Sequence, residues 1–138
     1  IQDMWKNNLG IDVQIQSQEW KVFQDTRISK NYEIARDGWV GDYNDPMTFM
    51  DLWVTDGGNN HTSWSNAKYD KLIEDARKEA DTAKRTQLLV DAEKLLMEEM
   101  PVGPIYCRVR DYAVSPKLKG MLRTAFQDID ITGCYIEG

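Results

Sequence analysis

Alternating apolar and polar positions indicate extended structure at three places along the chain. Residues 11–15 alternate with one face toward solvent, residues 32–39 form a second strand-like run, and the third run covers residues 102–114. A segment with helical spacing, residues 20–29, lies between the first two runs. Because a helix and not a tight turn joins these two predicted strands, we expect an α/β layer with parallel pairing.

Glycine, proline and polar capping residues set the expected helix boundaries. Residues 2–9 have the pattern of an amphipathic helix that Gly10 closes, and in residues 20–29 we expect Trp20, Phe23 and Ile28 to face inward. Three later helices are expected to begin at Asp45 followed by Pro46, at Ser65 or Asn66, and at Asp81 or Thr82. The last of them is expected to end before Pro101, because proline disfavours helical backbone in the residue before it.

The two long helices predicted between residues 65 and 100 should pack against each other through apolar positions at helical spacing. Those positions are Tyr69, Leu72, Ile73, Ala76 and Ala80 in the first helix, and Leu88, Leu89, Ala92, Leu95, Leu96 and Met100 in the second. The tail from residue 117 to residue 138 is expected to be irregular. Its anchoring positions would be Leu118, Met121, Leu122, Phe126, Ile129 and Ile131.

Length and charge limit the class of protein. A chain of 138 residues is one domain by default and can bury a sizeable core, and 41% apolar content favours a globular chain. The net charge of −6 argues against nucleic acid or an anionic membrane as the main partner. The chain starts inside a predicted helix, without an initiator Met or a signal peptide, which suggests a piece of a longer protein.

Cysteine and histidine add little chemistry to this picture. Cys107 falls in the apolar pattern of residues 102–114, where we expect a buried small hydrophobe, and a disulfide with Cys134 is possible. The single histidine, His61, lies in a polar loop at residues 55–65, and a surface position is expected there. No companion ligands stand at metal spacing, so no metal site is expected.

The segment Arg36-Asp37-Gly38-Trp39-Val40-Gly41-Asp42-Tyr43-Asn44-Asp45-Pro46 carries the candidate chemistry. Its glycines allow close backbone approach, Trp39 offers a broad apolar face, and Asp42 can meet a cation. An extended, amine-bearing ligand could therefore pair its main chain here by strand addition and place its ammonium at Asp42. The structural alternative, a bulged strand that runs into a turn, accounts for the same residues.

An enzyme is the competing functional class. The sequence holds no Gly-x-Ser-x-Gly elbow, no phosphate-binding glycine loop and no His-Glu-x-x-His motif. Asp42 and Asp45, with Asp37 nearby, could serve as a carboxylate pair at a glycosidic bond. Strand alternation, however, would point Asp37 and Asp42 to opposite faces, and a helix cap explains Asp45 better.

Three blocks resemble one protein family. The segment from Arg36 to Phe49 resembles the signature of the oligopeptide-binding proteins of ABC importers, in the peptide/nickel solute-binding family, and most of all their Gram-positive branch. Residues 66–73 resemble the helix that follows in that family, and residues 84–106 resemble the next helix, its Met-Pro stop and the returning strand. The similarity spans nearly the whole chain and is weakest after Gly120.

The resemblance implies a fold and a set of site residues. The fold would be α/β, a fragment of a two-lobed periplasmic-binding-protein-like (type II) fold, with residues 1–104 in the second lobe. Residues 105–138 would be a strand and tail that return through the hinge toward a first lobe missing from this chain. Asp42 would match the acid that pairs with the peptide amino terminus, Gly38 to Val40 the backbone that pairs with the peptide main chain, Trp39 a pocket wall, and Arg36 an arginine near the peptide carboxylate.

The same resemblance implies partners and a location. The ligand would be an oligopeptide and the partners the membrane permease subunits of an ABC importer, with no cofactor, metal, nucleic acid or catalysis. The protein would be extracytoplasmic, either periplasmic or on the cell surface through a lipid anchor on an absent N-terminus. Two alternatives stay open: a relative that binds a dipeptide or a nickel chelate, and an acid-dependent hydrolase. Nickel-binding relatives lack the Trp-x-x-Asp arrangement, so Asp42 favours a peptide.

Overall fold

The computed structural model describes residues 1–124 and 128–138, which form two compact units. The first unit is Ile1–Ala35 and the second is Arg36–Gly138. Each unit is described by itself below, because the candidate site and the core that supports it both lie in the second.

Two short helices make up the regular structure of the first unit. Helix α1, Gln2–Leu9, ends as predicted at Gly10, whose φ of 68° is left-handed and suits a residue without a Cβ. Helix α2, Trp20–Ile28, begins at Glu19, whose carboxylate accepts hydrogen bonds from the N–H groups of Lys21 and Val22.

The apolar side chains of the first unit are not buried as predicted. Neither helix contains a buried residue, and Trp20 and Ile28, expected to face inward, are 61% and 57% exposed. Phe23 is half-buried, with its ring centroid 6.0 Å from that of Trp20. A unit of this size has too little chain to enclose a core. The amphipathic pattern therefore predicted the helix correctly, but it could not predict whether the apolar face would be buried.

The predicted parallel α/β layer is not present in the part of the chain that the structure describes. Residues 11–15, 32–39 and 102–114 carry no strand, and the strands that do occur there pair antiparallel. Alternation marks a segment that suits a sheet, but a strand also needs a partner to take its backbone hydrogen bonds, and the described chain offers these segments none. Cys107, expected to be buried in such a strand, is exposed; Cys107 and Cys134 are free thiols.

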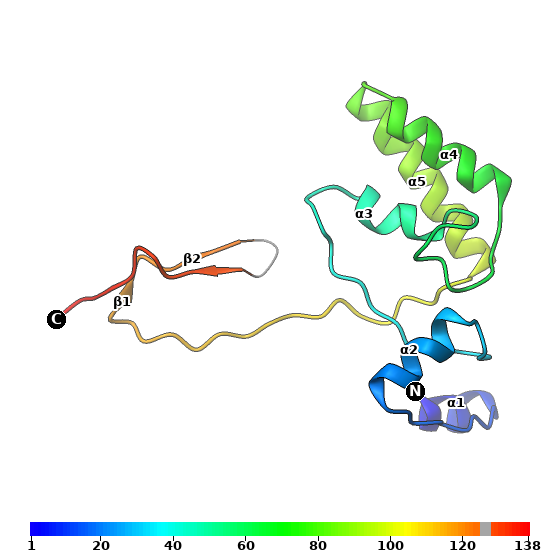
Figure 1. Ribbon diagram of the computed structural model, residues 1–138, viewed down its shortest axis with the longest axis horizontal. Coiled ribbons are helices and arrows are strands. Elements are labelled where there is room, and N and C mark those ends of the chain that lie inside the picture. Colours follow the sequence, from blue (N-terminus) through cyan, green and yellow to red (C-terminus); the bar gives the residue numbers. More distant parts are fainter. Residues whose placement is uncertain (125–127) are drawn as a thin grey trace. The chain divides into compact units, whose positions relative to one another are not determined.

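Helices form the core of the second unit. Helix α3, Met47–Met50, continues as the 3₁₀ turn η1, Asp51–Trp53. Helix α4, Ala67–Lys78, lies beside helix α5, Thr82–Glu99, and α3 packs on α5 (Figure 1). No helix in residues 1–124 or 128–138 is long and apolar enough to cross a membrane.

Both long helices begin as predicted, and the second also ends as predicted. The side chain of Asn66 accepts hydrogen bonds from the N–H groups of Lys68 and Tyr69, and that of Asp81 accepts one from Lys84. Helix α5 ends at Glu99, and the next residue, Met100, has a left-handed φ of 50° before Pro101. Local chemistry therefore sets the start of both helices and the end of α5.

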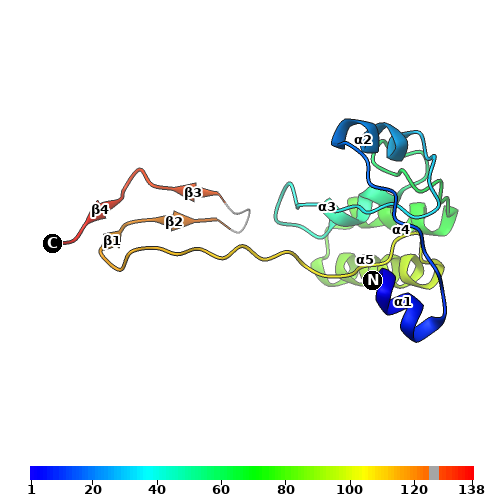
Figure 2. The same ribbon diagram turned by 90° about the horizontal axis from the view of Figure 1, so that it is seen from below.

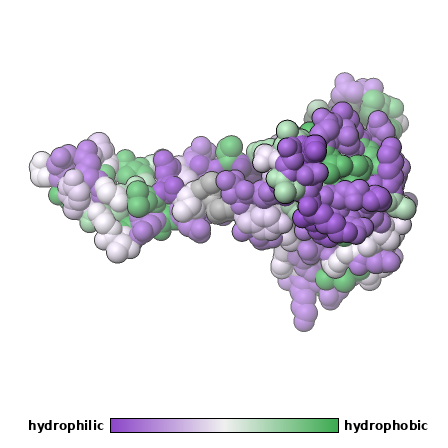
Figure 3. Space-filling model, turned by 90° about the horizontal axis from the view of Figure 1, so that it is seen from above, coloured by the Kyte–Doolittle hydropathy of each residue, from purple (hydrophilic) through white to green (hydrophobic). Residues whose placement is uncertain are grey.

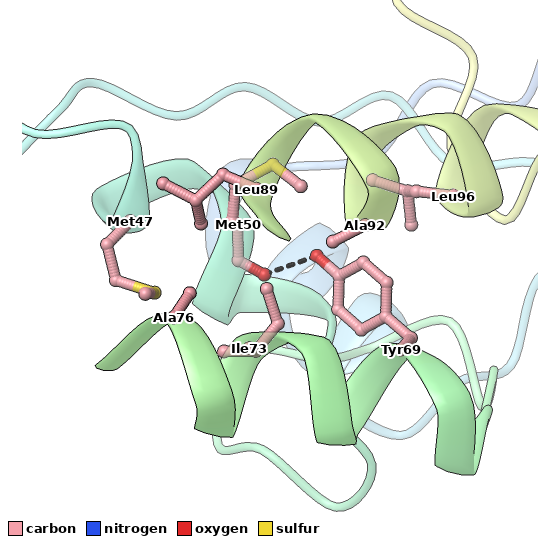
Figure 4. Close-up of a cluster of buried hydrophobic side chains, with 8 residues drawn as sticks. All are labelled: Met47, Met50, Tyr69, Ile73, Ala76, Leu89, Ala92 and Leu96. Carbon is pink, nitrogen blue, oxygen red and sulfur yellow. Dashed lines mark hydrogen bonds between the residues drawn. The ribbon is translucent and has the colours of Figure 1, made fainter. Parts of the chain in front are cut away.

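Tyr69 is the largest of the fully buried core side chains (Figure 4). Its side chain is fully buried, and its hydroxyl donates a hydrogen bond of 2.5 Å to the carbonyl oxygen of Met50, which joins α4 to α3. Burial raises the pKa of Tyr69, so the hydroxyl stays protonated and remains a donor. The core consists of Met47, Met50, Tyr69, Ile73, Ala76, Leu89, Ala92 and Leu96.

Two predicted core positions are wrong. Ala80 is exposed because α4 ends at Lys78, and Met100 is 58% exposed because it follows the end of α5. Leu72, Leu88 and Leu95 are partly buried against the core, as expected for the edge of a helix pair. Apolar residues at helical spacing therefore predict core positions only between the observed ends of the helix.

A buried asparagine organises the loop between η1 and α4. Asn60 is 5% exposed, and its amide nitrogen donates to the carbonyl oxygens of Trp53, Val54 and Trp64 at 3.0–3.2 Å. Its side-chain oxygen accepts from the hydroxyl of Thr62 at 2.8 Å. The loop was predicted from its turn residues, but nothing in the sequence distinguished Asn60 as the residue that closes it.

The C-terminal tail is more regular than predicted. Strand β1, Leu118–Lys119, pairs antiparallel with β4, Tyr135–Ile136, and β2, Leu122–Arg123, pairs antiparallel with β3, Ile129–Asp130 (Figure 2). Leu122, Ile129 and Ile131 are exposed, whereas Leu118 and Met121 are half-buried. The predicted anchor Phe126 lies outside the described residues.

Candidate ligand-binding site

The residues predicted to bind a ligand lie on one continuous segment at the start of the second unit. Arg36, Gly38, Trp39, Val40 and Asp42 are all exposed, with Trp39 at 41% and Val40 at 63%. The segment leads into α3 (Figure 1). These side chains are therefore free to meet a ligand, and sequence adjacency keeps them together.

The two glycines of the segment differ in what surrounds them. A Cβ added at Gly38 would meet no heavy atom within 4 Å. A Cβ added at Gly41 would lie 3.2 Å from Cγ2 of Thr48 and 3.3 Å from Cζ of Phe49. A side chain at position 41 would therefore press on Thr48 and Phe49, whereas the space beside Gly38 is open to something else.

The backbone at Asp42 is fixed while its side chain stays exposed. Its N–H donates a hydrogen bond of 2.9 Å to the hydroxyl of Thr48, a residue that is 2% exposed. Within residues 1–124 and 128–138, no hydrogen bond or ion pair engages the carboxylate of Asp42. A carboxylate held by its backbone but without an internal partner can accept hydrogen bonds from a cationic ligand.

Asp45 has a structural role, as predicted, and a partner that sequence reasoning missed. Its carboxylate accepts a hydrogen bond of 2.8 Å from the N–H of Met47 at the start of α3. It also accepts two from Arg85, Nη1 to Oδ2 at 2.8 Å and Nη2 to Oδ1 at 2.7 Å. The hydrogen bonds from Arg85 lower the pKa of Asp45, so this carboxyl group stays ionised and is a poor general acid.

The remaining acid, Asp37, and the histidine, His61, lie in different segments of the second unit. Oδ1 of Asp37 accepts a hydrogen bond of 2.7 Å from the N–H of Gly38. His61 is half-buried in the loop before α4. Across the described residues, no group of three or more His, Cys, Asp and Glu side chains is arranged to hold a metal ion.

Comparison with known proteins identifies relatives of nearly the whole chain. Residues 1–61 match the family described as bacterial extracellular solute-binding proteins, family 5 middle. The oligopeptide-binding protein OppA of Bacillus subtilis is 39% identical over 138 residues, 99% of this chain and 25% of that protein. The periplasmic murein peptide-binding protein MppA of Escherichia coli is 41% identical over 120 residues, 87% of this chain and 22% of that protein.

A solved structure extends the similarity to the fold. OppA of Haemophilus influenzae, in complex with the peptide RPPGFSPFR, has a TM-score of 0.81 and 31% identity, covering 99% of this chain and 27% of that one. The structural neighbours are two-lobed periplasmic peptide-binding proteins, and the present chain, which is itself mixed helix and sheet, covers only a fraction of them. The present chain spans about a quarter of the length of these relatives.

Proposed function

Since the chain belongs to the family of bacterial extracellular solute-binding proteins, family 5, we propose that it is the segment that captures the amino-terminal end of an oligopeptide. Members of the family are extracellular or periplasmic solute-binding proteins, which are not enzymes. The full-length protein would deliver its peptide to the permease subunits of an ABC importer. In cells that lack a periplasm, a lipid anchor at the N-terminus would hold it at the membrane.

The observation that carries the proposal is the exposed carboxylate of Asp42 on a fixed backbone. A peptide ammonium is a cation with three donors, and hydrogen bonds that involve a charged group contribute about 1.5–3 kcal/mol net. Every unmodified peptide has this ammonium at its amino end. A protein that recognises peptides through Asp42 would therefore bind them tightly, with little dependence on most of their side chains.

The backbone before Asp42 would pair with the peptide main chain. Gly38 to Val40 are exposed, and the space beside Gly38 is open, so a second backbone could approach there as an added strand. Trp39 would form one wall of a side-chain pocket, and Arg36 would approach the peptide carboxylate. Contacts to the peptide main chain and amino terminus would then define the site, and the side-chain pockets would adjust the affinity.

The domain assignment is also a proposal. Residues 1–104 would belong to the second lobe, and residues 105–138 would return through the hinge toward the first lobe. Exposed apolar side chains on the extended segments support it: Ile15 is 69% exposed, Ile105 68% and Val109 77%, and apolar surface lies open among polar residues in Figure 3. The remaining chain of a full-length protein would cover this surface and supply the missing strand partners.

Calorimetry on the full-length protein tests the proposed function. We expect an unmodified oligopeptide to bind at one site and to be recovered intact, as judged by mass spectrometry of the bound fraction. The protein could instead bind a nickel chelate or a dipeptide and not respond to longer peptides. That result would show that its ligand is another solute of the same family and not an oligopeptide. Recovery of cleaved peptide, or cleavage of a glycoside supplied in a parallel reaction, would instead establish the acid-dependent hydrolase.

The matched glycines test where the peptide backbone lies. Gly38→Ala should leave stability within about 0.5 kcal/mol, because the new Cβ meets open space. It should still weaken peptide binding about tenfold or more, because the Cβ enters the space of the peptide main chain. Gly41→Ala should instead destabilise the protein by about 1–3 kcal/mol, since the Cβ presses on Thr48 and Phe49.

Thermal melts and peptide titrations of both glycine variants provide the comparison. Undiminished affinity in Gly38→Ala would show that the peptide main chain does not approach this glycine. A large loss of stability in Gly38→Ala, in turn, would show that the full-length protein fills that space with its own chain.

A further inference from the structure

We propose that Arg85 is a positioning residue for ligand binding, which acts through Asp45 and Thr48 to fix the backbone that presents Asp42. The inference rests on the proposed role of Asp42 and adds residues that lie outside the predicted binding segment. Arg85 lies in α5, 40 residues from Asp45 along the chain. It would not touch the peptide itself.

The first link is the ion pair between Arg85 and Asp45. Two parallel hydrogen bonds of 2.8 and 2.7 Å join the guanidinium to both carboxylate oxygens, and each side chain is 29% exposed. Nε of Arg85 also donates to the carbonyl oxygen of Ala76 at 3.2 Å, near the end of α4. A bidentate pair fixes orientation as well as distance, so Asp45 is held against both long helices.

The second link runs from Asp45 to Thr48. The carboxylate of Asp45 accepts the N–H of Met47 at 2.8 Å, and its carbonyl oxygen accepts the N–H of Thr48 at 3.2 Å. These bonds set where α3 begins and hold Thr48 in its first turn. Thr48 is buried, so the packing of α3 within the protein determines where its side chain lies.

The third link runs from Thr48 to the candidate binding residue. The Thr48 hydroxyl accepts the N–H of Asp42 at 2.9 Å, and the Thr48 methyl group limits the space at Gly41. The peptide bond between Gly41 and Asp42 is thus tied to α3, which in turn is tied to α5. A ligand-binding group that is held in place in advance binds more tightly than one that must be ordered during binding.

Substitutions at Arg85 test this chain of contacts, with Arg77 as the matched control. Arg85→Met removes the bidentate pair, and Asp45→Asn removes its charge while keeping an oxygen to cap α3. Arg77 in α4 pairs with Asp51 through one longer contact of 3.5 Å outside the predicted binding segment, so Arg77→Met is a control for the loss of one arginine charge. Each variant is made in the full-length protein and titrated with a free peptide and its N-acetylated twin.

The ratio of the two affinities separates positioning from general stability. We expect Arg85→Met and Asp45→Asn each to weaken binding of the free peptide about tenfold and to leave the acetylated peptide nearly unchanged. Combining the two substitutions should add little to either one, because both break the same pair. Arg77→Met should leave the ratio at the wild-type value.

Two results would overturn the inference, and they differ in what they say about Asp42. An unchanged affinity ratio in both Arg85→Met and Asp45→Asn, with a wild type that prefers the free peptide, would reject the positioning role alone. A wild type that binds both peptides equally would reject the role of Asp42 and the positioning role with it.

Discussion

Asp42→Asn in the full-length protein is expected to weaken binding of an unmodified peptide by about 2–3 kcal/mol, roughly 30- to 150-fold. Asparagine has nearly the size and shape of aspartate, so the N–H bond from residue 42 to Thr48 should be kept. What is lost is the negative charge that would pair with the peptide ammonium. Calorimetric titration gives the change in affinity directly.

A matched acid provides the control for this substitution. Asp56→Asn changes an exposed aspartate in the turn after η1, away from the candidate binding segment in sequence, and should leave the affinity unchanged. A loss in Asp56→Asn as large as that in Asp42→Asn would point to the overall charge of the protein and not to a specific contact.

Tyr69→Ala is expected to lower the free energy of unfolding by about 3–5 kcal/mol, because it removes the largest fully buried side chain of the core. The ring is fully buried and lies edge-on to Trp64, with centroids 5.0 Å apart. The substitution also removes the hydroxyl that donates to Met50 and joins α4 to α3. Urea unfolding of the full-length protein, followed by tryptophan fluorescence, measures the loss.

Two further variants divide this effect into its parts. Tyr69→Phe keeps the ring and should cost about 1–3 kcal/mol, the expected range when a buried carbonyl group loses its donor. Lys71→Ala, two residues along the same helix and with a side chain 69% exposed, should change stability by no more than about 0.5 kcal/mol. Equal stability of Tyr69→Ala and Lys71→Ala would contradict the assignment of the core.

Local chemistry made the helices predictable from the sequence. Gly10 closes α1, Asn66 and Asp81 begin the two long helices, and Met100 and Pro101 end the second, each through contacts within a few residues. The apolar spacing that placed Tyr69 in the core works for the same reason. Where the pattern ran past a true helix end, as at Ala80, the prediction was wrong.

Contacts between distant residues set the limits of prediction. Residues 11–15 and 102–114 alternate as strands do, yet a strand also depends on a partner that alternation cannot identify. The pair of Asp45 and Arg85 joins positions 40 residues apart, and Asn60 gathers carbonyl groups from both sides of a loop. The candidate binding segment could be proposed from the sequence because its residues are adjacent, whereas Arg85, which we propose supports it, could not.

The most direct test of the central claim compares a free peptide with its N-acetylated twin in wild type and in Asp42→Asn. Acetylation removes the ammonium charge, and Asp42→Asn removes the carboxylate charge. If these two groups pair, acetylation should weaken binding to the wild type strongly and binding to Asp42→Asn hardly at all. Equal effects of acetylation on both proteins would contradict the pairing of Asp42 with the peptide amino terminus.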